Sequence, residues 1–392
     1  MLVIDKTAVL ESVRERWDRL GRTPGLNVGL LVPEQWVENY TPMRFEDSGN
    51  YSWDAVVGKV LFPGKEASGM YRTGLGKAFR KFRPDVVMMM EESFSLFALQ
   101  TLIAARIHAP RARLIFYSNN VTSYNHFTYR LGPLYKLIGR WVTPRFDVGL
   151  CVNDLAANVL KATGYDVQVR KLFYGINERL FYPRSKEEAR AELGLPSDVP
   201  VFLYAGRFLE LKGIQDLIRA FEQVCKERPQ QDMRLLLVGD GDYAGELQSL
   251  AASGSFRERI EFRRTVSLEQ MPALMSAADA FVLPSRKEIN EQFGRVNIEA
   301  MLCGTTIIGS TSGGIPEAIG DGGFLFDAGD VGQLANVLGL VLDGADEVAQ
   351  RREKGKEQAL AGYSTGAFVQ GLVDLFRELS GRDPGQSALS DS

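Results

Sequence analysis

Two glutamates eight positions apart, Glu291 and Glu299, lie on either side of a predicted helix start. Gly294 ends the polar loop that holds Glu291, and the run Arg295–Leu302 after it contains good helix formers. The first glutamate is therefore expected in a loop, and the second about one turn inside a helix. Both carboxylates would then reach the same pocket.

The start of this helix is suited to bind a phosphate. Its first backbone N–H groups have no partner within the helix and lie at the positive end of the helix dipole. A carboxylate beside them does not bind phosphate, but it accepts two hydrogen bonds from a vicinal diol such as that of a ribose or a hexose. The combination predicts a site for a sugar nucleotide, whereas two glutamates at this spacing, taken alone, are also common on a solvated helix face.

The segment 283–317 carries a longer pattern around these glutamates. Its positions are Pro284-Ser285, Glu291, Phe293-Gly294, Glu299-Ala300-Met301, Gly304 and Gly313-Gly314-x-x-Glu317. This string resembles the signature of retaining glycosyltransferase family 4, whose members have the GT-B architecture of two Rossmann-like, doubly wound α/β domains facing a central cleft. The resemblance implies that Glu299 holds the ribose hydroxyls and Glu291 the donor sugar. It also implies that Gln292, Phe293 and Gly294 line the donor site.

A second constellation, Gly206-Arg207-Phe208-x-x-x-Lys212-Gly213, follows the predicted strand Val201–Ala205. The glycine allows a sharp turn, and two cations five residues apart before a helix can converge on a diphosphate. Such cations are also common as solvated charges at a helix start. The family resemblance makes Arg207 and Lys212 the donor diphosphate ligands and, with Glu291, the expected catalytic residues of this domain.

The segment Gly239-Asp240-Gly241-Asp242 after the predicted strand Arg234–Val238 allows two interpretations. Asp-x-Asp after a strand is typical of the metal site of another, metal-dependent glycosyltransferase fold. We expect a turn instead, because glycine lies on both sides of Asp240 and no further ligand is evident nearby. No metal and no cofactor are therefore expected besides the co-substrate, a UDP- or GDP-sugar. Gly239 is expected to approach the donor, and Arg264 the nucleobase.

The alternation of apolar strands and helical patterns predicts parallel sheets covered on both faces. The strands of the first half are predicted at 26–32, 55–61, 86–90, 113–117, 148–152 and 167–173, and its helices at 5–20, 71–82, 94–107, 128–141 and 154–163. The 392 residues are long enough for two domains. We expect an acceptor-side domain at 1–178 and a donor-binding domain at 179–362. A helix at 363–380 is expected to pack on the first domain, and residues 381–392 are expected to form a disordered tail.

The acceptor candidates lie in the first domain. Many family members have a glycine pair in the first loop, whereas this chain has Pro33-Glu34-Gln35-Trp36. Trp36 and Tyr40 are therefore candidates for a sugar-stacking platform, with loop packing as the alternative. Many members place a histidine after the fourth strand, near the reacting carbon. Here Asn119 and Asn120 occupy that place and His126 follows. Asn120 or His126 is expected to take part in catalysis, and Asn119 or His126 is expected to contact the acceptor. The alternative is that these side chains only cap the loop.

The charge is unevenly distributed. Residues 1–175 contain 23 Lys and Arg against 16 Asp and Glu, a net charge of +7, and the rest of the chain has −10. An anionic partner is expected for the first half. Nucleic acid is not expected, because the basic residues are scattered and the pI is near 5.7.

The predicted helix at 129–145 combines basic and interfacial aromatic residues: Arg130, Lys136, Arg140 and Arg145 with Tyr129, Tyr135 and Trp141. Such a helix can rest on an anionic bilayer. Leu134, Leu137, Ile138 and Trp141 fit a helix packed on the sheet equally well, and a soluble phosphorylated acceptor would also explain the charge. The chain has no membrane-spanning run and no signal-peptide pattern. A cytoplasmic protein, peripheral at the inner face of the membrane, is therefore expected.

These features predict transfer of a sugar from a nucleoside diphosphate to a hydroxyl acceptor with retention of configuration, in polysaccharide or glycoconjugate biosynthesis. The acceptor is expected to be lipid-linked or phosphorylated. A nucleotide-sugar epimerase of the same architecture and a non-catalytic sugar-nucleotide-binding protein are the alternatives. A nicotinamide dehydrogenase is disfavoured because no G-x-G-x-x-G follows the first predicted strand.

Overall fold

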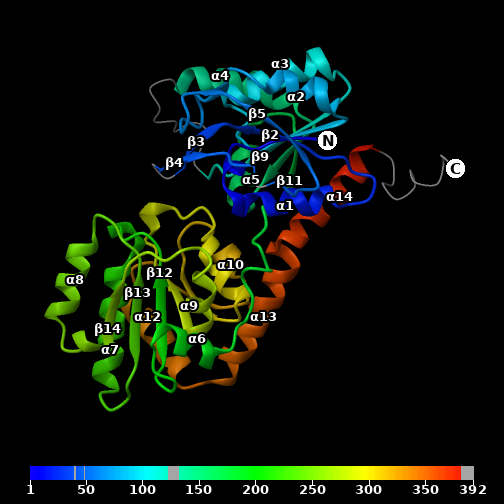
Figure 1. Cartoon of the computed structure of the whole chain (residues 1–392). Helices are drawn as coiled ribbons and strands as arrows, with labels where there is room; N and C mark the ends of the chain where they lie inside the picture. Colours follow the sequence, from blue (N-terminus) through cyan, green and yellow to red (C-terminus); the bar gives the residue numbers. More distant parts are fainter. Residues whose placement is uncertain (39–40, 48, 122–131, 381–392) are drawn as a thin grey trace. The chain divides into compact units, whose positions relative to one another are not determined.

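The computed structural model describes residues 1–38, 41–47, 49–121 and 132–380 (Figure 1). The chain divides into two compact units. Unit 1 contains Met1–Gly175 and the C-terminal segment from Thr365, and unit 2 contains Ile176–Ser364. Each unit has its own parallel sheet with its own helices, as the strand and helix alternation predicted.

Unit 1 is built on a seven-stranded sheet in the order β11-β10-β9-β8-β1-β2-β5. All neighbouring strands in it run parallel. Counted along the chain from β1, the first six strands follow the spatial order of dinucleotide-binding folds, in which the direction of winding reverses between the first and fourth strands. The strands are β1 Leu2–Ile4, β2 Gly29–Pro33, β5 Asp54–Gly58, β8 Val86–Met89, β9 Arg113–Ser118, β10 Val148–Cys151 and β11 Gln168–Lys171.

One interior strand of this sheet, β1, was not predicted. Strand β1 has only three residues, all buried, and pairs with β2 on one side and β8 on the other. A strand this short carries no periodic pattern, so the sequence indicated a helix at 5–20 before the first strand. The structure has the 3-10 helix η1, Lys6–Val9, and then α1, Glu11–Gly21.

The helices of unit 1 cover both faces of the sheet: α2 Leu75–Phe82, α3 Leu96–His108, α4 Gly132–Val142 and α5 Asp154–Lys161 lie on one face, and α1 and α14 Thr365–Ser380 lie on the other (Figure 1). Two small antiparallel pairs complete the unit, β3 Gln35–Glu38 with β4 Thr41–Arg44 and β6 Val60–Leu61 with β7 Met70–Tyr71. Helix α14 packs against α1, where the Phe368 and Trp17 rings meet edge to face at 5.8 Å. Side-chain packing thus joins the C-terminal helix to the N-terminal unit.

Unit 2 has a six-stranded parallel sheet in the order β14-β13-β12-β15-β16-β17. This is the complete dinucleotide-binding order, with the reversal between β12 and β15. The strands are β12 Val201–Ala205, β13 Arg234–Val238, β14 Ile260–Arg263, β15 Ala280–Leu283, β16 Thr306–Ser310 and β17 Phe324–Phe326. The helices are α6 Lys186–Leu193, α7 Ile214–Glu227, α8 Ala244–Ser253, α9 Met271–Ala277, α10 Arg295–Leu302, α11 Ile315–Ile319, α12 Val331–Leu342 and α13 Asp346–Tyr363.

The packing of α14 gives a first prediction. Phe368 is 1% exposed, so Phe368→Ala removes a buried ring and should lower the free energy of unfolding of unit 1 by about 3–5 kcal/mol. Gln370→Ala changes an exposed residue of the same helix and serves as the control, with an expected change within about 0.5 kcal/mol. Urea unfolding of both variants tests this, and equal stability of the two would show that α14 does not support unit 1.

Candidate functional site

Two loops meet at the point in unit 2 where the winding reverses. One follows β12 and runs from Gly206 to Gly213, and the other follows β15 and begins at Pro284. Gly213 has φ 69°, and a Cβ there would lie 2.0 Å from the carbonyl oxygen of Pro284. Only glycine allows the two backbones to approach this closely. The two motifs singled out in the sequence are therefore in direct contact.

This contact brings together two of the predicted site residues. Lys212 Nζ lies 2.5 Å from Glu291 Oε2, and Ser285 Oγ donates to the same oxygen at 3.1 Å. Both side chains of the ion pair are largely enclosed, with 15% and 19% exposure. The Glu291 carbonyl also accepts a hydrogen bond of 2.7 Å from the Gly314 N–H, so the glycine pair after β16 closes on this loop from the next strand.

Glu299 lies inside helix α10, as its spacing from Gly294 predicted. The helix begins after Gly294, which has φ 71° and, as a glycine, has no side chain to cap the first N–H groups. Glu299 is 5% exposed, and its Oε1 accepts a 2.6 Å hydrogen bond from Arg295 Nε one turn earlier. Burial raises the pKa of Glu299, and the Arg295 charge opposes this shift. The helix start thus lies about one turn from a buried carboxyl group.

A set of supporting contacts was not singled out from the sequence. The Arg286 guanidinium makes two 2.9 Å hydrogen bonds to Asp216 on α7, which holds the loop after β15 against the helix that follows Gly213. Ser310 Oγ donates to the Ser285 carbonyl at 2.5 Å, and Ser312 Oγ donates to the Arg286 carbonyl at 2.8 Å. These residues lie inside or beside the motifs, but their partners are up to 70 positions away.

The Gly239–Asp242 segment packs on the first loop, and a turn begins at its last residue. A Cβ on Gly239 would lie 1.9 Å from the Gly206 carbonyl oxygen, and Phe208 N–H donates to the Asp240 carbonyl at 2.8 Å. The Asp240 side chain accepts from the N–H of Gly241. In the residues that the structure describes, no cluster of three or more His, Cys, Asp or Glu side chains could hold a metal ion.

The other donor candidates occupy varied environments. Arg207 is exposed, and its carbonyl accepts a 2.9 Å hydrogen bond from the Tyr204 hydroxyl. Arg264 and Gln292 are also exposed. The Phe293 ring is only 3% exposed and packs edge to face against Tyr363 at 5.3 Å, so this side chain does not face a ligand.

In unit 1 the structure links Asn119 and Asn120 to a residue that was not singled out. Their backbone N–H groups donate to Glu92 Oε1 at 2.8 and 3.0 Å, which holds the segment after β9 against the one after β8. Within the described part of the chain, Glu92 Oε2 is buried and has no hydrogen-bond partner. Burial is the main cause that raises the pKa of Glu92 to about 8, and the neighbouring Glu91 adds to it.

The expectation that Trp36 forms a sugar-stacking platform is wrong. Trp36 lies in β3, and its ring is 2% exposed and packs near Phe97. The Lys6 ammonium lies over this ring, 5.0 Å from its centre. Lys6 also forms an ion pair with Glu91, at the point where the winding of unit 1 reverses. The loop-packing alternative therefore holds for Trp36. Tyr40 and His126 lie outside the described residues.

Helix α5 is capped by Asn153, the residue before its first position. The Asn153 side chain accepts a hydrogen bond from Ala156 N–H, and Asp154 is the first residue of the helix. Asp154 forms an ion pair with Lys171.

The raised pKa of Glu92 gives a second prediction. The folded protein keeps this carboxyl protonated up to about pH 8, whereas the unfolded chain releases the proton near pH 4.5. The contribution of Glu92 to the free energy of unfolding is therefore fully present below about pH 4.5, and it is lost as the pH rises towards 8. Glu92→Gln keeps an oxygen acceptor and removes the titration, so its melting temperature should fall less than that of the wild type between about pH 5 and 8.

Thermal unfolding at several pH values, with Glu11→Gln on the exposed face of α1 as the control, measures this difference. Parallel pH profiles for Glu92→Gln and wild type would contradict the assignment.

Comparison with known proteins agrees with this geometry. Residues 185–358 match the family model described as "Glycosyl transferases group 1". A D-inositol 3-phosphate glycosyltransferase of Corynebacterium jeikeium is 33% identical over 230 residues, which cover 55% of this chain and 54% of the relative. An N-acetyl-alpha-D-glucosaminyl L-malate synthase of Bacillus anthracis is 31% identical over 213 residues, or 54% of each chain. The chain thus spans about half the length of the curated relatives it matches.

Solved structures resemble nearly the whole chain. Anabaena HepE in complex with UDP has a TM-score of 0.71 at 18% identity, over 96% of this chain and 99% of HepE. A sucrose-phosphate synthase of Thermosynechococcus elongatus has a TM-score of 0.70 at 21% identity, over 97% and 98% of the two chains. At such identities the likeness concerns the fold. The predicted GT-B fold is confirmed, and residues 185–358 of unit 2 are similar to the group 1 glycosyl transferases.

Proposed function

We propose that the chain transfers a sugar from a nucleoside diphosphate donor to a hydroxyl acceptor, with retention of configuration and without a metal ion. The observation that supports this most directly is the meeting of Lys212 and Glu291 in the loop before α10, with Glu299 buried about one turn inside that helix. Cation, helix amides and carboxylates match the diphosphate, the ribose diol and the sugar hydroxyls of one ligand.

Each group has a distinct role in this proposal. Lys212, Arg207 and the first amides of α10 stabilise the diphosphate, whose negative charge grows as the glycosidic bond breaks. Glu291 accepts hydrogen bonds from the donor sugar, and Glu299 accepts them from the ribose. The acceptor attacks from the face on which the diphosphate leaves, which retains configuration without a covalent intermediate on the protein. Asn120, held through its backbone by Glu92, is the described candidate of unit 1 for the acceptor side.

The relatives support a UDP- or GDP-sugar as donor without choosing between them. HepE was solved with UDP-glucose as well as UDP, whereas a relative in Corynebacterium glutamicum is named as GDP-mannose-dependent. The names of two relatives contain D-inositol 3-phosphate and L-malate, which are anions with hydroxyl groups. An anionic acceptor, soluble or at a membrane surface, also agrees with the net charge of +7 on residues 1–175.

A thermal-shift screen with UDP-, GDP- and ADP-sugars tests donor binding, since a ligand at about 100 times its dissociation constant adds roughly 2.7 kcal/mol. Incubation of the best donor with and without anionic hydroxyl acceptors then separates the alternatives. An epimerase would isomerise the sugar without an acceptor, and a non-catalytic protein would bind the donor and leave it unchanged. Either result would overturn the proposal.

The donor site gives a third prediction. Glu299→Ala should weaken nucleotide binding by about 1.5–3 kcal/mol, because it removes hydrogen bonds to a charged group. Arg207→Ala should lower turnover more than donor affinity, because the charge it meets grows in the transition state. Calorimetry and steady-state kinetics measure the two effects, with Glu246→Ala and Arg257→Ala as exposed controls in the same unit. Wild-type nucleotide affinity in Glu299→Ala would refute the assignment of that residue.

A fourth prediction concerns metal ions. The Asp240 carbonyl of the Gly239–Asp242 segment accepts a hydrogen bond from Phe208 N–H, and the Asp240 side chain accepts one from Gly241 N–H. We therefore expect activity to survive EDTA and Asp242→Ala to keep most of it. Loss of transfer on chelation, with recovery on addition of manganese or magnesium, would show that the reaction needs a metal.

A further inference from the structure

The outer side of the α3–α4 layer in unit 1 exposes large apolar side chains. Helices α3 and α4 pack against each other on one face of the sheet (Figure 1). Along each helix, neighbouring exposed apolar residues are three or four positions apart, so they share one side of that helix. They are Ile103 at 46% and Ile107 at 67% exposure on α3, and Leu134 at 45%, Leu137 at 65% and Trp141 at 46% on α4.

These side chains are not needed to pack the helices on the sheet. On α4 a separate stripe serves that purpose, formed by Tyr135 and Ile138, which are 3% and 8% exposed, and by the fully buried Val142. Helix α4 therefore has two apolar sides, one buried and one exposed. An exposed apolar surface spread over two helices is typical of an interaction site.

The stretch of sequence that forms this surface carries positive charges and no negative ones. Between Glu92 and Asp147 the sequence has no Asp or Glu and seven Lys or Arg. On the outer side these include Arg106, Arg140 and Arg145, and the Arg145 guanidinium lies 4.3 Å from the centre of the Trp141 ring. Cations beside apolar and indole side chains match the boundary of an anionic bilayer, where phosphates lie next to acyl chains.

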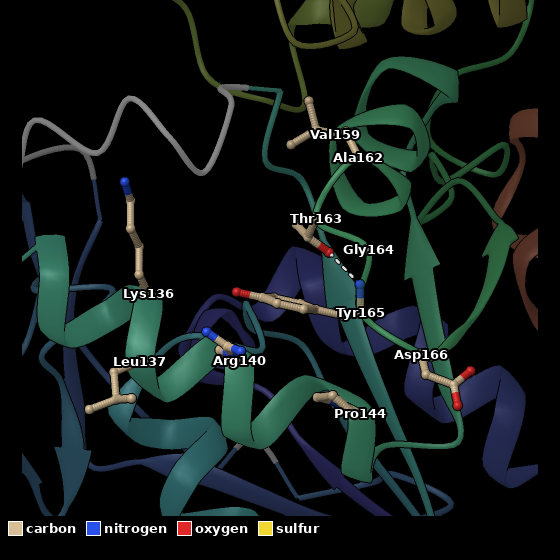
Figure 2. A pocket seen from close by; sticks show the side chains of 10 residues that line it. All are labelled: Lys136, Leu137, Arg140, Pro144, Val159, Ala162, Thr163, Gly164, Tyr165 and Asp166. Carbon is tan, nitrogen blue, oxygen red and sulfur yellow. Dashed lines mark hydrogen bonds between the residues drawn. The ribbon is translucent and has the colours of Figure 1, made fainter.

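A hollow of about 760 Å³ flanks α4 on the side of the loop after α5. Lys136, Leu137 and Arg140 line it from α4, and Thr163, Gly164 and Tyr165 line it from the loop (Figure 2). Burial raises the pKa of Tyr165, and the positive charge of Arg140 opposes this shift. Asp166, the carboxylate of the lining, points away from Lys136 and Arg140 in Figure 2.

We propose that the α3–α4 face, defined by Ile103, Ile107, Leu134, Leu137 and Trp141 with the cations beside them, binds the surface of an anionic phospholipid bilayer. The apolar side chains enter the boundary of the acyl chains, and Lys136 and Arg140 bind headgroup phosphates at the hollow. None of the helices in the described ranges could itself cross a membrane, so this contact is peripheral. It concerns unit 1 and stands independently of whether the chain transfers a sugar.

Co-sedimentation of the full chain with vesicles tests the proposal. We expect binding to phosphatidylcholine vesicles that contain phosphatidylglycerol, little binding to phosphatidylcholine alone, and loss of binding as salt shortens the Debye length from about 30 Å at 0.01 M to about 3 Å at 1 M. The double variant Lys136→Ala/Arg140→Ala should bind roughly 30-fold more weakly, which corresponds to about 1 kcal/mol for each cation near the surface.

Leu137→Glu/Trp141→Glu places two carboxylates on the proposed face and should abolish binding. Leu360→Glu is the matched apolar control, since Leu360 is 44% exposed in unit 2, and Lys226→Ala/Arg257→Ala is the matched cation control. Both controls should bind as the wild type does. All substituted residues are at least partly exposed, and unchanged thermal unfolding checks that each variant folds.

Three outcomes would overturn the proposal: no binding to anionic vesicles at low salt, unchanged binding by both α4 double variants, or binding independent of anionic lipid. Self-association that the Leu137→Glu/Trp141→Glu variant abolishes in sedimentation velocity, without vesicle binding by the wild type, would assign the face to a second copy of the chain. A thermal-shift measurement with UDP and GDP on the same variants separates failure of this proposal from failure of donor binding.

Discussion

The Lys212–Glu291 ion pair joins two loops whose paired residues are 79 positions apart, and the rest of the candidate donor site depends on that junction. It forms because Gly213 leaves room for the Pro284 carbonyl, where a Cβ would lie 2.0 Å away. A side chain at this position would separate the loops and move the cation away from the carboxylate. The close approach of the two backbones at the carboxyl ends of β12 and β15 therefore determines where the Lys212 and Glu291 side chains lie.

Unit 1 repeats this arrangement with different surroundings. Lys6 follows β1 and pairs with Glu91 after β8, the same topological positions that Lys212 and Glu291 occupy in unit 2. In unit 1, however, the ammonium also lies over the Trp36 ring, and the Glu91 side chain is only 7% exposed. Removing one partner of such a buried pair typically costs 3–5 kcal/mol, since the other charge stays buried and unpaired. The same topology thus holds the candidate donor site in unit 2 and a buried structural pair in unit 1.

The parts of the molecule that the sequence predicted well are those with long, regular patterns. Continuous apolar strands alternating with helices predicted the parallel sheets, and Gly294 followed by helix formers predicted that Glu299 lies inside α10. Strand β1 was missed because three residues carry no period, although both its neighbours depend on it. The contact of Glu92 with the N–H groups of Asn119 and Asn120 joins residues 27 and 28 positions apart, and no local pattern encodes it.

Helix α4 shows why a hydrophobic pattern alone does not assign a face. Leu134, Leu137, Ile138 and Trp141 form one apparent stripe in the sequence, yet only Ile138 is buried. The helix packs through Tyr135, Ile138 and Val142, and turning it to bury Trp141 instead would expose those three. Sheet packing therefore needs one apolar side, and the second adds nothing to the stability of the unit in water. Because exposed apolar area is unfavourable in water, a second apolar side among cations is best explained by a partner that covers it.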